Sequence, residues 1–199
     1  MNGWNMHTGQ AVVLALENVD TDQLIPARFM SIPRSEGYGN HLLHDLRRNN
    51  DGTLRNDLPL NETPSASILI AGRNFGCGSS REAAVYALVD AGFRVVIAPS
   101  FGDIFAGNAV NNGLLPAQVS EETLAALIEK NISNVQIDLE RKTFTTEDQT
   151  FDFALDATRQ TKLINGWDDI DLTLAESEKI SAYRAALATG SRWLWPDIR

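Results

Sequence analysis

The sequence has 199 residues, 43% of them hydrophobic and 22% charged, which is typical of a globular protein with a sizeable core. Asp and Glu outnumber Lys and Arg by 26 to 17, and the formal charge of -9 argues against a nucleic-acid partner. No apolar run approaches the roughly 20 residues that span a bilayer, and no signal-peptide pattern opens the chain, so we expect a cytoplasmic protein without membrane contact. The single cysteine, Cys77, excludes an internal disulfide, and the three histidines lack metal-ligand spacing, so we expect no metal on this chain.

The first apolar run, residues 11–16, predicts a buried strand because a polar turn follows it at residues 17–23. Aspartate and asparagine in that turn can close Asx-turns on the backbone, which is a structural role. The alternative is that Asp22 is an active-site acid. Residues 34–65 are the least hydrophobic part of the chain, with a short helix expected over residues 40–47. Such a long connection is either a mobile binding loop or a solvated surface loop.

The glycine-rich stretch Asn74–Glu82 lies between an apolar run at residues 68–71, which predicts a strand, and a helical pattern. Its glycines allow a left-handed backbone and close approach of a ligand, and Ser79 or Ser80 can cap the helix, whose N-terminus favours an anion. Arg81 adds a cation whose fork suits a carboxylate. The stretch is either a tight turn with a serine cap or an anion site, and the paired serines with the arginine favour the site.

Strands and helices alternate after this stretch. A β-branched run at residues 94–98 predicts a buried strand, and a helix opens at residues 99–105 and stops at Asn111–Gly113. Residues 114–119 then predict another strand, and Ser120 caps a third helix. This β-α-β-α-β order implies parallel strands joined by right-handed crossovers.

The C-terminal part of the sequence has a different pattern. Apolar residues with a period of two predict paired strands over residues 135–139 and 151–155. A capping box at Thr173–Glu176 then predicts a C-terminal helix over residues 173–190. The tail at residues 191–199 carries two tryptophans, which pack onto the same chain or dock a partner. Without a repeat or a break in composition, we expect one α/β domain over residues 1–199.

Five stretches together resemble the small subunit of 3-isopropylmalate dehydratase, a family related to the mobile C-terminal domain of aconitases. The matching stretches are residues 18–29, 74–82, 96–101 with 103–105, 112–116, and 165–170 with 172–174. The resemblance covers nearly the whole chain. It implies an aconitase-type swivelling β/β/α domain with a mixed or parallel sheet and flanking helices, in which residues 34–65 form a mobile substrate loop.

The resemblance also implies an activity and a partner. The family's enzymes are hydro-lyases of leucine biosynthesis, which interconvert 2-isopropylmalate and 3-isopropylmalate through an alkene. In the family a separate large subunit holds a [4Fe-4S] cluster. We therefore expect no cofactor on this chain, a small dicarboxylate substrate, and activity only in a heterodimer or heterotetramer with a large, cluster-bearing subunit.

Site residues follow from the same resemblance. Ser79 takes the proton, Ser80 helps to hold the substrate, and Arg81 binds a carboxylate. Asp22 matches an acidic residue that aconitases place near the site, and it joins Ser79 and Arg81 as a catalytic candidate. Three further residues are candidates for substrate binding: Gly78, Thr21 and Arg28. We expect no metal ligand among these residues.

Three positions depart from the family pattern. Ala83 stands where bacterial members usually have histidine, and Trp167 and Asp171 stand where leucine and glycine are usual. One alternative is therefore a paralogous small subunit that hydrates and dehydrates another substituted malate, of the citramalate or dimethylmalate type, or a copy with reduced activity. An alternative from another class is a non-catalytic, anion-binding regulatory module. Cys77 is interpreted as structural, because the sequence suggests no base beside it.

Overall fold

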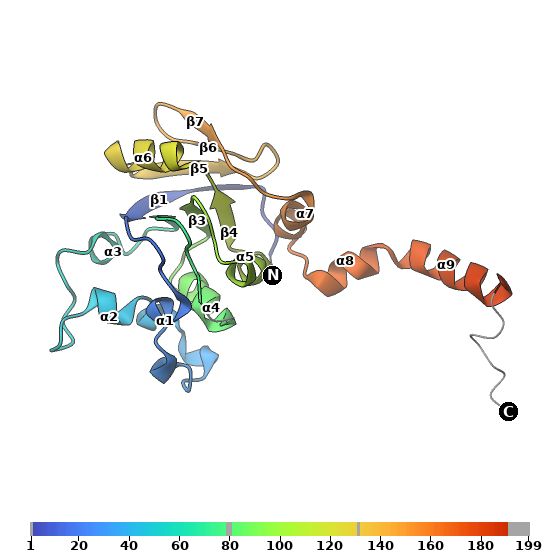
Figure 1. Ribbon diagram of the computed structural model, residues 1–199, viewed down its shortest axis with the longest axis horizontal. Coiled ribbons are helices and arrows are strands. Elements are labelled where there is room, and N and C mark those ends of the chain that lie inside the picture. The colour runs from blue at the N-terminus through green and yellow to red at the C-terminus, as the bar shows by residue number, and fades with distance from the viewer. Residues whose placement is uncertain (1, 79–80, 131, 191–199) are drawn as a thin grey trace.

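The computed structural model describes residues 2–78, 81–130 and 132–190, and its centre is a seven-stranded sheet in the order β4-β3-β2-β1-β5-β6-β7 (Figure 1). The strands are β1 (Met6–Leu14), β2 (Ile68–Ala71), β3 (Val95–Ala98), β4 (Leu115–Gln118), β5 (Asn134–Asp138), β6 (Thr143–Thr145) and β7 (Thr150–Asp152). Strands β1 to β4 pair in parallel, and β5, β6 and β7 continue antiparallel from the other edge of β1. The predicted mixed sheet with flanking helices is confirmed.

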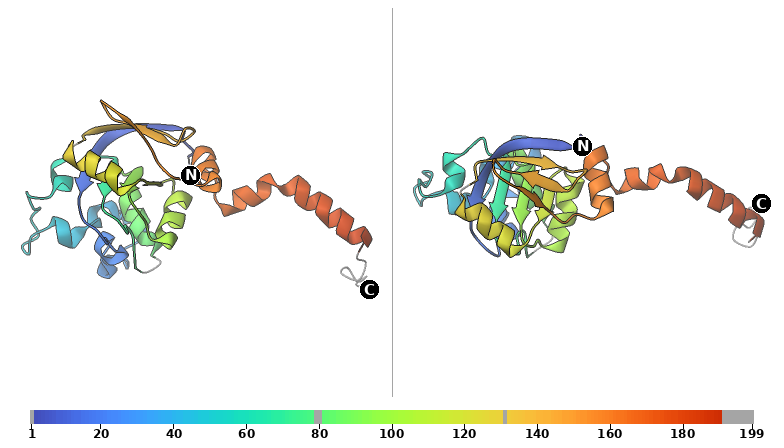
Figure 2. Two further views of the ribbon diagram at one scale, coloured as in Figure 1. Left: turned by 45° about the horizontal axis from the view of Figure 1, so that its top comes forward. Right: turned by 90° about the horizontal axis from the view of Figure 1, so that it is seen from above.

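Both faces of the parallel strands are covered (Figure 2). Helices α4 (Glu82–Asp90) and α5 (Asp103–Asn111) lie on one face, and α6 (Glu121–Glu129) with the β5–β7 ribbon lies on the other. Successive side chains of a strand point to opposite faces, so Leu69 joins the core under α4 while Ile68 and Ile70 join the core under α6. Strands covered on both faces read as unbroken apolar runs, which is why these short strands were predictable.

The segment between β1 and β2 is built from short helices. They are α1 (Thr21–Leu24), η1 (Ala27–Phe29), η2 (Arg34–Glu36), η3 (Gly39–His41), α2 (His44–Arg47) and α3 (Pro59–Glu62). The helix predicted over residues 40–47 is divided into η3 and α2, because Leu43 adopts a left-handed φ of 50°. Leu42 and Leu43 are fully buried, so this part of residues 34–65 belongs to the core. The mobility of the segment stays a prediction.

The C-terminal elements are α7 (Ala157–Asn165), α8 (Asp169–Ala175) and α9 (Ser177–Gly190). Helix α7 packs on the domain through the fully buried Leu163, whereas α8 and α9 lead away from it (Figure 1). We call α8 and α9 together the C-terminal arm. The capping box predicted at Thr173 is wrong: Asp168 and Asp171 form the box, and the helix predicted over residues 173–190 is replaced by α8 and α9.

Two strand predictions also needed correction. Strand β1 begins at Met6, five residues before the predicted run, because its first half alternates between exposed and half-buried residues as it pairs with β5. The predicted polar turn after β5 contains β6, which pairs with both β5 and β7 around the buried Phe144.

In the described residues, no helix is long and apolar enough to cross a membrane. The tail at residues 191–199 lies outside the described residues.

Candidate active site

The loops that follow β1 and β2 are joined by backbone hydrogen bonds at the C-terminal edge of the parallel strands. Asn18 N–H donates to the Arg73 carbonyl oxygen (2.9 Å), and Gly76 N–H donates to the Val19 carbonyl oxygen (2.7 Å). Parallel strands end at the same edge, which is where α/β folds bind ligands. We call residues Gly72–Gly78 with Arg81 the catalytic turn.

The loop after β3 completes this edge. Asn74 N–H donates to Ser100 Oγ (2.8 Å), and Phe75 N–H donates to the Ser100 carbonyl oxygen (3.0 Å). Gly76 has φ +71° and lies so close to α5 that a Cβ there would be 2.2 Å from Phe105 Cγ. A Cβ on Gly102 would be 2.6 Å from the Gly76 carbonyl oxygen. These glycines permit the close packing that fixes the backbone of the catalytic turn.

Asp22 and Arg81 form an ion pair across these loops. Asp22 lies in α1, whose N-cap Asp20 forms a capping box with Gln23. Arg81 occupies the N-cap position of α4, and its side chain is 26% exposed, against 56% for Asp22. The N-terminal end of a helix carries partial positive charge, so the Arg81 guanidinium and α4 together favour an anion. The ion pair brings together two residues that the sequence analysis named separately as catalytic candidates.

Thr21 and Gly78 lie beside this pair. Thr21 is buried, and its N–H donates to the Cys77 carbonyl oxygen (3.0 Å). Gly78 has φ +94°, and a Cβ there would be 3.8 Å from Thr21 Oγ1. Four of the seven predicted site residues, Thr21, Asp22, Gly78 and Arg81, are therefore brought together by two loops that are more than fifty residues apart in sequence.

Ser79 and Ser80 lie outside the described residues, so their predicted roles are not addressed by the structure. The N-cap position of α4 is Arg81, whose side chain forms no capping hydrogen bond. Cys77 is half-buried. In the described part of the chain, no group of three His, Cys, Asp or Glu residues could hold a metal ion.

Arg28 is placed differently from the other candidates. It forms an ion pair with Asp45, in which Arg28 Nη1 also donates to Asp45 Oδ2 (3.0 Å). The hydrogen bonds from Arg28 and His44 lower the pKa of the Asp45 carboxyl to about 2. These contacts join η1 to α2, and within the described residues Arg28 forms no hydrogen bond or ion pair with Arg81 or Asp22. A role of Arg28 in substrate binding stays a prediction.

The sequence analysis named neither Ser100 nor Asn112 as a candidate site residue. Ser100 ties the loop after β3 to the catalytic turn, and Asn112 Nδ2 donates to Glu82 Oε1 (2.9 Å) at the start of α4. A signal for Ser100 was available, because it directly follows a predicted parallel strand and so had to end at the same edge. Asn112 was interpreted as part of a helix stop, and its contact with α4 depends on packing that the sequence does not reveal.

Comparisons with known proteins show which family the chain resembles. The family described as the aconitase C-terminal domain matches residues 1–122. The chain is 44% identical to the 3-isopropylmalate dehydratase small subunit of Oceanobacillus iheyensis, over 94% of this chain and 100% of that protein. It is 46% identical to the same subunit of Cytophaga hutchinsonii, over 86% and 89%. A crystal structure of 3-isopropylmalate dehydratase from Methanocaldococcus jannaschii superimposes with a TM-score of 0.64 at 26% identity, over 90% of this chain and 99% of that one.

Proposed function

We propose the function of this chain from one premise: it belongs to the aconitase C-terminal domain family, among the small subunits of 3-isopropylmalate dehydratase. The chain is the small subunit of a hydro-lyase that interconverts 2-isopropylmalate and 3-isopropylmalate, and it functions with a large subunit. The observation that carries our assignment of the site is the pairing of Asp22 with Arg81 at the N-terminus of α4.

In this proposal Arg81 binds a carboxylate of the substrate. Its guanidinium has five N–H donors in a fixed fork, so it can hold a substrate carboxylate while Asp22 keeps the side chain in place. Gly78 presents no side chain, which leaves room for the substrate against the backbone, and the buried Thr21 supports the loop beneath it. Arg81 and Gly78 therefore form the floor of a half-site.

Ser79 is proposed as the residue that takes the proton, with Ser80 holding the substrate. A free hydroxyl with a pKa near that of water, ~15.7, lies ~9 units above neutral pH, which corresponds to ~12 kcal/mol. A helix terminus supplies at most ~2 kcal/mol of this. The remainder requires transition-state stabilisation in a site from which water is excluded, so the half-site needs a second protein surface to close it.

We propose that the large subunit supplies this surface in a heterodimer or heterotetramer and carries the [4Fe-4S] cluster. The donor set of this chain does not fit such a cluster, because clusters are held by several cysteine thiolates and the sequence has one cysteine. Every role assigned to this chain above is therefore one of binding, orientation or proton transfer.

The three departures from the family pattern have structural explanations or lie outside the half-site. Ala83 is buried in the core under α4, and Asp171 accepts the Asp168 N–H (3.0 Å) in the capping box of α8. The Trp167 N–H donates to the Lys162 carbonyl oxygen at the end of α7 (2.9 Å). None of these observations favours another substituted malate or a non-catalytic regulatory module.

The test is reconstitution with a large subunit of the same family, followed by alkene absorbance with 2-isopropylmalate and, in parallel, citramalate and dimethylmalate. Ser79→Ala is expected to lower kcat by ~10²–10⁴ fold, the usual contribution of a general base. Arg81→Lys keeps the charge and loses the fork, so an effect of ~10²-fold on kcat/KM is expected. Arg141→Lys, which alters an exposed arginine paired with Asp138, is the matched control. Unchanged kcat/KM in an assembled Arg81→Lys complex would refute the site assignment, and preferred turnover of another malate would refute the substrate.

A further inference from the structure

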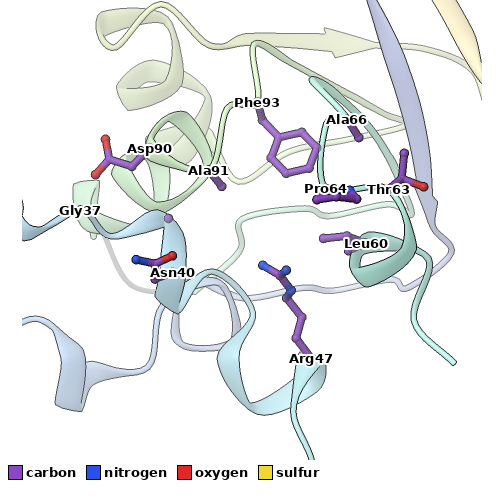
Figure 3. A pocket seen from close by; sticks show the side chains of 11 residues that line it. Gly37, Asn40, Arg47, Leu60, Thr63, Pro64, Ala66, Asp90, Ala91 and Phe93 are labelled. Atoms are coloured by element: carbon purple, nitrogen blue, oxygen red, sulfur yellow. The ribbon is translucent and has the colours of Figure 1, made fainter. Parts of the chain in front are cut away.

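A cavity lies at the opposite end of α4 from Arg81. It has a volume of about 280 Å³, opens to solvent, and is lined by parts of the segments 37–47 and 60–66 and by the chain around the C-terminal end of α4 (Figure 3). Nine helical residues at ~1.5 Å per residue place its wall ~13 Å from the N-terminus of α4. The cavity is therefore separate from the half-site.

Arg47 is the cationic group of this cavity. Its Nε donates to Asn61 Oδ1 (2.7 Å), and Asn61 Nδ2 donates back to the Arg47 carbonyl oxygen (3.0 Å). This pair of bonds fixes the side chain, and Figure 3 shows the guanidinium directed between Asn40 and Leu60. Among the described residues, Arg47 forms no ion pair, and its Nη groups donate no hydrogen bond. The Nη groups are thus available to a ligand.

The cavity has one carboxylate, Asp90, which accepts the Tyr38 N–H (3.0 Å) and pairs with Arg34 (3.7 Å) rather than with Arg47. A smaller, adjoining cavity of about 210 Å³ is also lined by Arg47 and Asn40, and in addition by Arg48 and His44. Burial and the neighbouring positive charge of Arg48 both lower the pKa of Arg47. Seven other described arginines form ion pairs with Asp or Glu in this acidic chain. Two adjacent arginines that face cavities instead indicate a place for an anion.

One part of the lining of the larger cavity is apolar. Phe93 and Leu60 contribute apolar surface, and Pro64 lies between them (Figure 3). The Asn40 side-chain amide lies on the same side of the cavity as the Arg47 guanidinium. An inorganic anion would leave the apolar walls without a partner, whereas a ligand with a short alkyl group would cover them.

We propose that this cavity binds a short-chain aliphatic carboxylate, with the carboxylate on Arg47 and Asn40 and the alkyl group against Leu60, Pro64 and Phe93. Such a ligand joins the segment 34–65 to the end of α4, whose other end carries Arg81. The site is a regulatory position on the small subunit, and it does not depend on the function proposed above.

Titration calorimetry of the full chain with 3-methylbutanoate tests the proposal, with neutral 3-methylbutanamide and inorganic phosphate as comparison probes. We expect saturable binding of the carboxylate and at least about tenfold weaker binding of the amide, because the amide lacks the charge that Arg47 recognises. Arg47→Gln is expected to weaken binding at least about tenfold. Arg55→Gln, which alters an exposed arginine paired with Asp57, and Arg81→Gln in the half-site are expected to bind as the unaltered chain does.

Amide chemical shifts of the unaltered chain give a second readout that does not depend on the folding of Arg47→Gln. Shifts on titration are expected at Asn40, Thr63 and Ala91, around the cavity. Absence of saturation, equal affinity for the amide, tighter binding of phosphate, or shifts centred on Arg81 would each overturn the proposal.

Discussion

The catalytic turn and the C-terminal arm differ in what holds them in place. The turn is joined to the loops after β1 and β3 by backbone hydrogen bonds and is packed against α5. The arm instead leaves Ile170 (67%), Leu174 (62%) and Tyr183 (70%) exposed. Isolated helices of this length are marginal in water, so the arm depends on its own caps and on the ion pair of Asp169 with the buried Lys162 of α7, whereas the turn depends on the whole domain. The proposed site residues therefore lie where tertiary contacts fix the backbone.

The largest expected difference is between two leucines. Leu69 is fully buried in β2 beneath the turn, so Leu69→Ala should lower the free energy of unfolding by ~2–5 kcal/mol. Leu174→Ala removes the same atoms from the arm, where they are exposed, and should change it by less than ~0.5 kcal/mol. Urea unfolding followed by circular dichroism measures both. A cost above ~1 kcal/mol for Leu174→Ala would mean that the arm packs on the domain.

Two glycines separate close packing from backbone strain. Gly76→Ala combines a left-handed φ of +71° with a clash against Phe105, and we expect a loss of ~2–4 kcal/mol. Gly92→Ala has a left-handed φ of +98° with no atom within 4 Å of the added Cβ, so only ~1–2 kcal/mol of strain is expected. Thermal unfolding of the two variants gives the difference. Equal losses would show that Phe105 moves aside and that the turn is less constrained than we infer.

Much of this contrast was predictable from sequence, for physical reasons that differ between regions. The parallel strands were found because burial on both faces gives unbroken apolar runs. Ser120 was recognised because serine is a preferred N-cap residue, and in the structure its side chain accepts the Thr123 N–H. Strand β6 was missed because three residues with one buried Phe144 resemble a polar turn. Local patterns locate elements well when each element buries its own repeat.

The site was predictable in its members but not in its geometry. Arg81 and Asp22 were named from motifs, and their pairing requires the chain to return through a parallel crossover between residues 22 and 81. Arg28 shows the limit, since its motif position says nothing of Asp45, which lies seventeen residues further along in another helix. The start of the C-terminal helices was misplaced because Asp168 and Asp171 form the capping box, which begins five residues before Thr173. Competing caps differ by less than sequence patterns can resolve.

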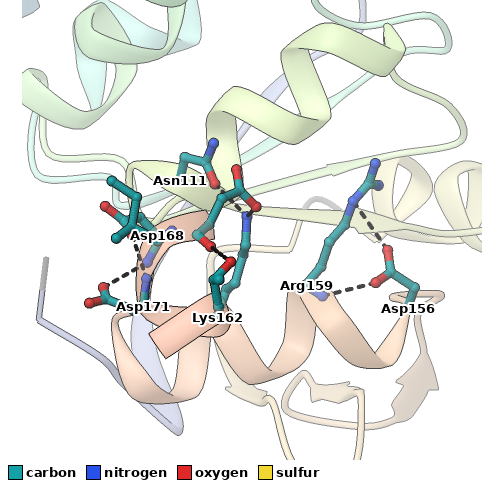
Figure 4. Close-up of polar contacts among 9 residues, drawn as sticks. Asn111, Asp156, Arg159, Lys162, Asp168 and Asp171 are labelled. Carbon is teal, nitrogen blue, oxygen red and sulfur yellow. Dashed lines mark hydrogen bonds and ion pairs between the residues drawn. The ribbon is translucent and has the colours of Figure 1, made fainter. Parts of the chain in front are cut away.

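Two N-cap aspartates sharpen the comparison further (Figure 4). Asp156 accepts the Arg159 N–H at the start of α7 (2.9 Å), and Asp168 accepts the Ile170 N–H at the start of α8 (2.8 Å). Replacing such a cap by alanine costs ~1 kcal/mol. Helix α7 packs on the domain through Leu163, so Asp156→Ala should lower the global unfolding midpoint. Asp168→Ala should speed amide hydrogen exchange in the arm and leave the midpoint unchanged. A shifted midpoint in both variants would place α8 in the same cooperative unit as the sheet.

The smallest effect concerns the pair formed by Arg28 and Asp45, which holds η1 against α2 near the start of the predicted substrate loop. The folded pKa of Asp45 is about 2, below its ordinary value of 3.8, so the unfolded chain binds the proton first as pH falls. The pair therefore adds stability above pH 3.8 that disappears as pH falls towards 2. Both side chains are more than half exposed, so solvent screens the pair and its contribution to stability is small. Carbon-13 titration of the Asp45 carboxyl, with Arg28→Gln as the comparison, measures the shift. A midpoint near 3.8 in the unaltered chain would mean that Arg28 is free, and it would then be available to the substrate as its motif predicts.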